Sequence, residues 1–353
     1  MTKQEMLHLA LATNLLTAIG AAPHLQRPNF PILSRWYPPG VQVALLRFGE
    51  PALRHFLYLE RPEGMDLDDA EGFAAVGQAR PLTDGDQLMA VPESYQSVGH
   101  LYRGIEQGLE RLVERHGEGG VFIGPPEAQA TTEVFEWPEL TAVTDLASAK
   151  AAIELIVEQG EGSRGDWRDA HFGKFVALLE DYLATRAADQ GFEPAHPVEP
   201  AYVHRPPDVE AETLTITDPL TVQVADLVNA IYESTLETLS RYFVHSGETD
   251  GQVRVLATTA KHLMNWVMRP LGGLLTTLPV GPDRPGVLAG PAFEIVQPSF
   301  YVLPHRVAAW RILAEPLEQL AARADRLSGT AGLAQLGELA IDLHGMARDI
   351  ESA

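Results

Sequence analysis

Apolar residues recur at helical spacing from the beginning of the chain. Between residues 2 and 19, Leu7, Leu11 and Leu15 form one stripe, and a glycine follows where a C-terminal cap belongs. Pro23 prevents the helix from continuing. Nearly the whole circumference of this helix is apolar, so we expect it to be buried on most sides.

The same periodicity predicts a series of further helices. Asp145 is a candidate N-cap for one of them, and on another His171, Phe175, Leu178 and Tyr182 share a face. The predicted ranges are residues 93–116, 145–161, from about 166 onwards, 219–245, 250–277, 304–327 and 333–350. Because these helices dominate the pattern, the predicted fold class is all-α.

Three segments lack a helical period. Residues 23–92 are irregular, with one short helix at 51–59 and at most a minor strand at 41–46, and such long loops often cover a site. Residues 193–217 are rich in proline and acidic residues and are typical of a linker, and residues 279–298 form a Pro/Gly loop.

These patterns predict three parts along the chain. Residues 1–192 form a helical bundle with a long loop-rich insertion, and residues 193–217 form a linker. Residues 218–353 form a C-terminal helical region, which we expect to pack on the bundle.

Composition narrows the classes of function. The 353 residues include 26 basic and 48 acidic ones, a formal charge of −22, which disfavours a nucleic-acid partner. There is no cysteine, which excludes disulfides, thiolate zinc sites, iron–sulfur clusters and cysteine nucleophiles. A transition metal would therefore be bound by histidine and carboxylate, which favours iron, manganese or a hard zinc site.

No membrane segment or signal peptide is expected. The apolar run of the first helix is interrupted by His8 and Asn14, and no stretch of about 18 uninterrupted apolar residues occurs. Together with the lack of cysteine, this predicts a cytoplasmic protein.

The sequence EMLH at residues 5–8 carries the sharpest chemical signal. Glu5 and His8 are three residues apart, so a helix places them on one face, where both can reach one metal ion. The alternative is a solvent-exposed pair at the end of a helix.

Other candidates lie on the later helices, each with a simpler alternative. His171 lies on an apolar stripe and could equally be a hydrogen-bonded core histidine, and His100 flanks an apolar face. Glu158 and Glu161 continue a row of carboxylates from Glu154, which a solvated helix face also explains, with Lys150 as a partner of Glu154. Taken together, four helices offer histidine or glutamate, which is the inventory of a metal site in a bundle core.

Several segments resemble a known family when taken in order. Residues 5–20, EMLHLALATNLLTAIG, resemble a helix of ferritin-like proteins of the iminophenyl-pyruvate dimer synthase type. The further matching segments are SVGHLYRGI at 97–105, IVEQGEG at 156–162, HF at 171–172, RPLG at 269–272, LPVGP at 278–282 and AGPAFE at 289–294. The resemblance covers most of the chain.

The resemblance implies a ferritin-like bundle and an enzyme of secondary metabolism that couples or oxidises imines derived from aromatic amino acids. We expect iron, or another divalent metal such as manganese, and a small-molecule substrate such as an imine or keto acid. The expected metal ligands are Glu5, His8, His100, Glu158, Glu161 and His171. The alternatives are a non-catalytic helical scaffold with satisfied buried polar groups, and a cation-storage protein. Whether the chain forms homo-oligomers stays open.

Three departures from the family pattern affect these expectations. The family has an earlier helix that carries a metal-binding glutamate, and this sequence starts at what would be the second helix, so a ligand is expected to be missing. His100 stands where relatives often carry glutamate, and Arg168 stands three residues before His171, so there is no second Glu-x-x-His.

Overall fold

The computed structural model describes most of the chain. The described residues are 1–33, 41–71, 73, 95–162, 166–204, 213–245, 247–296, 305–331 and 333–353. Much of the predicted insertion, at 34–40 and 74–92, lies outside them, as do residues 93–94 and 304 at the starts of two predicted helices. The described chain is mainly helical, which confirms the predicted fold class.

The chain divides into two compact units. The first consists of Met1–Gly20, Pro31–Pro126 and Glu139–Ala195, and the second of Ala21–Phe30, Glu127–Pro138 and His196–Ala353. The second unit thus includes two short segments that precede its main part in the sequence.

In the first unit, α1 (Thr2–Ala18) packs against α6 (Leu146–Gly160). Leu7 and Leu11 of α1 are buried, whereas Leu16 and Ile19 remain more than a third exposed. Between Leu7 and Ala18, Leu16 is the one exposed residue, so this part of the helix is buried on most sides, as its apolar circumference predicts.

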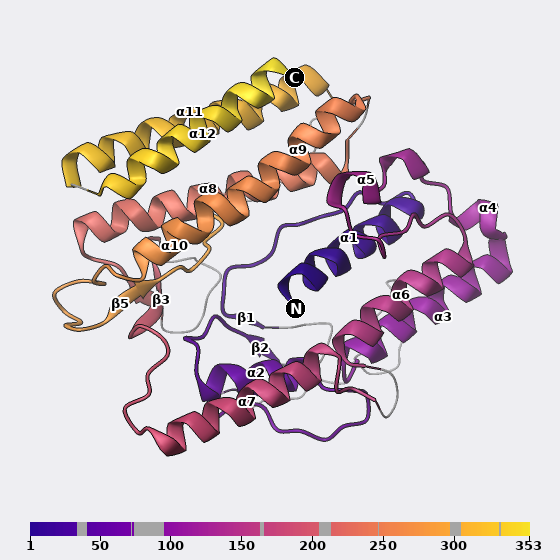
Figure 1. Ribbon diagram of the computed structural model, residues 1–353. Coiled ribbons are helices and arrows are strands. Elements are labelled where there is room, and N and C mark those ends of the chain that lie inside the picture. Colours follow the sequence, from indigo (N-terminus) through magenta and orange to yellow (C-terminus); the bar gives the residue numbers. More distant parts are fainter. Residues whose placement is uncertain are drawn as a thin grey trace, which may run out of the picture. The chain divides into compact units, whose positions relative to one another are not determined.

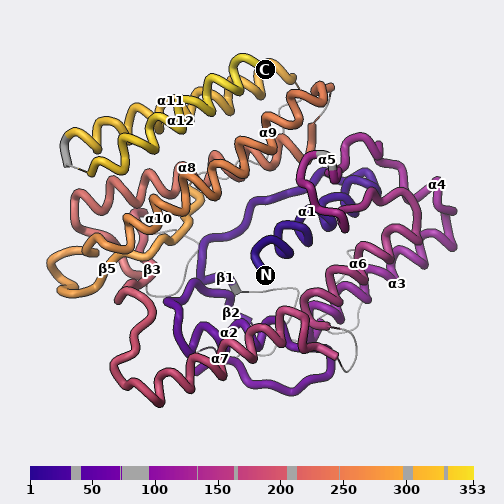
Figure 2. Tube along the Cα trace, viewed as in Figure 1, coloured from indigo at the N-terminus to yellow at the C-terminus, as the bar shows by residue number. Residues whose placement is uncertain are grey.

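Further helices complete this bundle and can be followed in Figure 1 and in the trace of Figure 2. Helix α6 also contacts α3 (Val98–His116) and α7 (His171–Ala188), and α2 (Glu50–Leu59) packs on α7. The smaller elements of the unit are α4 (Glu118–Val121) and the antiparallel pair β1 (Ile32–Leu33) and β2 (Gln42–Val43). A core cluster of Leu53, Leu57, Phe172, Leu179 and Tyr182 fills the space between α2 and α7.

The helix starts in this unit have local causes. Asp145 and Ser148 form a capping box at the start of α6, as the predicted N-cap requires. Helix α7 begins at His171 and not near residue 166, because Trp167 O accepts a hydrogen bond from Ala170 N in a turn that precedes the helix. His171 is consequently the first residue of its helix instead of lying one turn inside it.

The second unit contains α5 (Thr132–Phe135), α8 (Pro219–Phe243), α9 (Asp250–His262), α10 (Arg269–Leu275), α11 (Arg306–Ala331) and α12 (Ala334–Ser352). Helices α11 and α12 pack side by side as a hairpin (Figure 1). The predicted helix 250–277 is α9 and α10 joined by a π-helical turn at Leu263–Met268. This turn widens the helix just before Pro270, which lacks an N–H group and whose ring would crowd the preceding turn.

A three-stranded parallel sheet also belongs to the second unit. Its strands, in the order β4-β3-β5, are Leu214–Thr215, Val198–Tyr202 and Leu288–Gly290. Val198 pairs with Leu288, and Ala201 pairs with Leu214. The segment predicted to be a linker thus contributes two strands, and the predicted Pro/Gly loop contributes the third.

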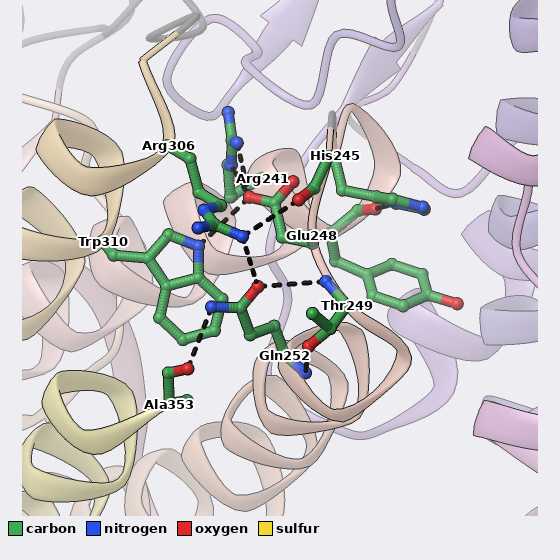
Figure 3. A network of polar contacts seen from close by, with 10 residues as sticks. Arg241, His245, Glu248, Thr249, Gln252, Arg306, Trp310 and Ala353 are labelled. Atoms are coloured by element: carbon green, nitrogen blue, oxygen red, sulfur yellow. Dashed lines mark hydrogen bonds and ion pairs between the residues drawn. The ribbon is translucent and has the colours of Figure 1, made fainter.

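A buried ion pair holds the turn between α8 and α9 (Figure 3). The Arg241 guanidinium of α8 contacts Glu248, and the side chains are 4% and 0% exposed. Trp310 Nε1 donates to the same Glu248 oxygen at 3.1 Å. Thr249 and Gln252 form a capping box at the start of α9. Side chains of α8 and α11 therefore meet at Glu248, just before the start of α9.

Among the residues that the structure describes, no helix is long and apolar enough to cross a membrane.

Candidate metal centre

Glu5 and His8, in the first two turns of α1, converge with His171, the first residue of α7. Each offers one ligand atom, and these atoms lie within 4.8 Å of one another. His171 Nδ1 is 2.7 Å from Glu5 Oε1, and His8 Nδ1 is 3.6 Å from Glu5 Oε2. The helical spacing of Glu5 and His8 and the late start of α7 together produce this geometry.

The three side chains form a site that is closed on one side. His8 is 8% exposed and His171 is 1% exposed, whereas the Glu5 side chain is 53% exposed. The two imidazole rings lie with their centroids 5.5 Å apart. A ligand could therefore approach the histidines from the side of the carboxylate.

The donor set fits a divalent transition metal. Two imidazole nitrogens and one carboxylate form a set that non-haem iron and catalytic zinc sites use, with coordination positions left open. Both Nδ1 atoms are directed toward the same carboxylate, so the three donors already point to a common region.

The charge of Glu5 is maintained by the histidines. Partial burial by itself would raise the pKa of this carboxyl, but its contacts with His171 and His8 lower the pKa to about 2. Glu5 is therefore ionised at neutral pH, as a metal ligand has to be.

Glu60 is a carboxylate near the site that the sequence analysis missed. It follows the last residue of α2 as its C-cap, and burial, followed by the negative charge of Glu5, raises its pKa to about 7. His8 and Glu161 also act on it. Glu60 lies at the edge of the loop-rich insertion, where no helical stripe connects it to the other candidates. The one indication in the sequence was that Glu60 directly follows the short helix predicted at 51–59.

Glu161 is buried at the end of α6. It is 3% exposed, and its Oε1 accepts a hydrogen bond from Gly99 N of α3. Burial raises its pKa, while this hydrogen bond and the nearby Arg103 oppose the shift. A pocket of about 300 Å³ reaches Glu161 and is lined by Pro62, Glu63, Gly64, Arg103, Val157, Glu161 and Gly162.

The structure does not bring His100 and Glu158 into the three-residue group. His100 Nδ1 accepts a hydrogen bond from Gln96 N, and its ring packs edge-on against Tyr95. Glu158 is exposed on α6. The partners of Lys150 are Glu106 and Glu110 of α3, at 2.9 and 2.6 Å, and not Glu154 as the alternative explanation supposed.

Comparison with known proteins places this site in a family. The family model described as ferritin-like matches residues 1–180. The chain belongs to the ferritin-like family. The matched range contains all three converging residues of this ferritin-like protein, and the family predicted from the sequence is confirmed.

A curated relative matches beyond that range. The ferritin-like chain is 29% identical over 341 residues to dichlorochromopyrrolate synthase of Lentzea aerocolonigenes. The match covers 90% of the chain but 31% of the relative, so the chain spans about a third of that protein's length. No solved structure matches the chain.

Proposed function

We propose that this ferritin-like protein is a metal-dependent enzyme of secondary metabolism that acts on imines or keto acids derived from amino acids. The observation that carries the proposal is the convergence of Glu5, His8 and His171 within 4.8 Å. The similarity to a protein named as a dichlorochromopyrrolate synthase supports the reaction class.

Glu5, His8 and His171 would hold the metal, for which we propose iron or manganese. His100, Glu158 and Glu161, predicted from the sequence as further ligands, stay part of the proposal. When bound, such a metal polarises a carbonyl or imine and provides redox chemistry.

The protein's own groups would handle protons and substrate charge. Glu60, with a pKa of about 7, can bind or release a proton near neutral pH, which suits an acid–base group. Arg103 lines the pocket beside Glu161 and can attract the carboxylate of a keto acid, in exchange for its present partner Glu63.

Elemental analysis of the purified protein tests the metal site. We expect about one or two equivalents of iron or manganese per chain, as in carboxylate-bridged bundle sites. His8→Ala and His171→Ala should lose this metal, whereas Glu154→Ala, which changes an exposed carboxylate on α6, should retain it. His100→Ala and Glu158→Ala show whether these residues contribute.

A non-catalytic scaffold is the second candidate, and one observation favours it. Both ring nitrogens of His8 and of His171 already lie near protein oxygen atoms of Glu5, Gln159 and Gln4. The scaffold would be supported if the wild-type protein bound no iron or manganese after reconstitution, or if His8→Ala and His171→Ala left the metal content unchanged.

A further inference from the structure

Two glutamines contact the outer nitrogens of the site histidines. His8 Nε2 lies 3.0 Å from Gln159 Oε1 of α6, and His171 Nε2 lies 3.2 Å from Gln4 Oε1 of α1. Each histidine thus directs Nδ1 toward Glu5 and Nε2 toward an amide.

Lys174 determines which way the Gln4 amide faces. Its Nζ donates to Gln4 Oε1 at 3.2 Å, from a position one turn after His171 on α7. An ammonium group only donates hydrogen bonds, so the amide atom beside it is the oxygen and not the nitrogen. The same oxygen faces His171 Nε2, which consequently carries a proton.

A proton on Nε2 leaves Nδ1 of a neutral His171 with a free electron pair. This pair points at the Glu5 carboxylate, 2.7 Å away, so a cation has to lie between the two groups. A divalent metal between the two groups would meet Nδ1 in the unprotonated form that binds metals. At His8, Gln159 Oε1 occupies the corresponding position, 3.0 Å from Nε2.

We propose that Gln4, oriented by Lys174, and Gln159 are positioning residues that hold His171 and His8 with Nδ1 available to a metal ion. This inference rests on the proposed metal site and adds the groups that prepare it. Outer partners of this kind orient a ligand ring and raise its basicity, and their loss commonly weakens metal binding about 10- to 100-fold.

Calorimetric titration of the metal-free full chain with Mn²⁺ tests the proposal. Gln4→Met and Gln159→Met remove the acceptor at similar size, and we expect each to weaken binding about 10- to 100-fold. Gln159→Glu keeps an acceptor and should restore most of the affinity. Lys174→Met keeps the Gln4 side chain but removes the hydrogen bond that orients its amide. We therefore expect Lys174→Met to weaken Mn²⁺ binding less than Gln4→Met does. Gln107→Met, at an exposed position on α3, is the matched control.

The outcomes separate the two proposals. A wild-type protein that does not bind Mn²⁺ would overturn the proposed metal site. Wild-type binding together with unchanged affinities of Gln4→Met and Gln159→Met would overturn the positioning role alone.

A second measurement does not depend on the variants folding. In ¹⁵N–¹H spectra of the histidine-labelled wild type loaded with diamagnetic Zn²⁺, we expect the protons of His8 and His171 on Nε2. Protons on Nδ1 would contradict the proposal.

Discussion

The carboxyl groups around the two site histidines differ in their ionisation because their surroundings differ. The contacts of Glu5 with His171 and His8 lower its pKa to about 2 and outweigh the opposing effect of its partial burial. Burial raises the pKa of Glu60 to about 7, with a further contribution from the charge of Glu5, and burial also raises the pKa of Glu161. Groups whose pKa values are pushed apart in this way are candidates for separate roles, here a metal ligand and a proton-binding group.

Glu60 makes the stability of the metal-free protein depend on pH. Its pKa in the folded state is about 7, above the ordinary value of 4.5. The folded protein therefore binds this proton more tightly, and the resulting stability is fully present below the ordinary pKa and is lost as the pH rises through about 7. Glu60→Gln stays neutral, so we expect a smaller decline of Tm between about pH 5 and pH 8.

Thermal unfolding at a series of pH values checks this expectation. Glu154→Gln, at an exposed position on α6, should leave the pH dependence of the wild type unchanged. A decline of Tm in Glu60→Gln as steep as that of the wild type would show that Glu60 does not retain its proton.

Among the elements, α1 depends on a distant glycine at its C-terminal end. Gly124 N donates to Ala18 O at 2.9 Å, and a Cβ atom at position 124 would lie 1.7 Å from Thr17 O. Because α1 carries Glu5 and His8 at its other end, this contact also helps to position the site.

Gly124→Ala should destabilise the first unit. The new methyl group would overlap with a backbone oxygen, which cannot move away by a side-chain rotation. We therefore expect the free energy of unfolding to fall by about 2 kcal/mol or more. Gly119→Ala in α4 is the matched control, because no atom lies within 4 Å of its Cβ position. Chemical denaturation measures both, and equal stabilities of the two variants would show that α1 can shift to make room.

At the scale of the whole molecule, each of the two units has interior interactions of its own. The first has the apolar cluster between α2 and α7, and the second has the ion pair of Arg241 and Glu248 at the junction of α8, α9 and α11 (Figure 3). Breaking a buried pair on one side leaves an uncompensated charge in the interior.

Arg241→Met should therefore destabilise the second unit strongly, by about 3–5 kcal/mol. Arg323→Met removes a partner of Asp226 from a pair that is about a third exposed, and its effect should stay below about 1 kcal/mol. Denaturant unfolding followed by circular dichroism compares them. A loss in Arg241→Met as small as that in Arg323→Met would mean that solvent reaches Glu248.

The sequence by itself determined what depends on residues close together in the chain. Helical periodicity located α1, α6 and α8, and Asp145 marked the start of α6. The spacing of Glu5 and His8 placed them on one face, because residues three apart in a helix are neighbours wherever the helix packs.

Only the tertiary structure decided which distant groups meet. The packing of α1, α6 and α7 brings His171 to Glu5 and leaves Glu158 exposed, and the end of α2 brings in Glu60. The parallel pairing of Val198 with Leu288 likewise joins strands from two segments that lack helical periodicity. Periodicity encodes relations over a few residues, whereas these contacts depend on how whole elements pack, which no local pattern specifies.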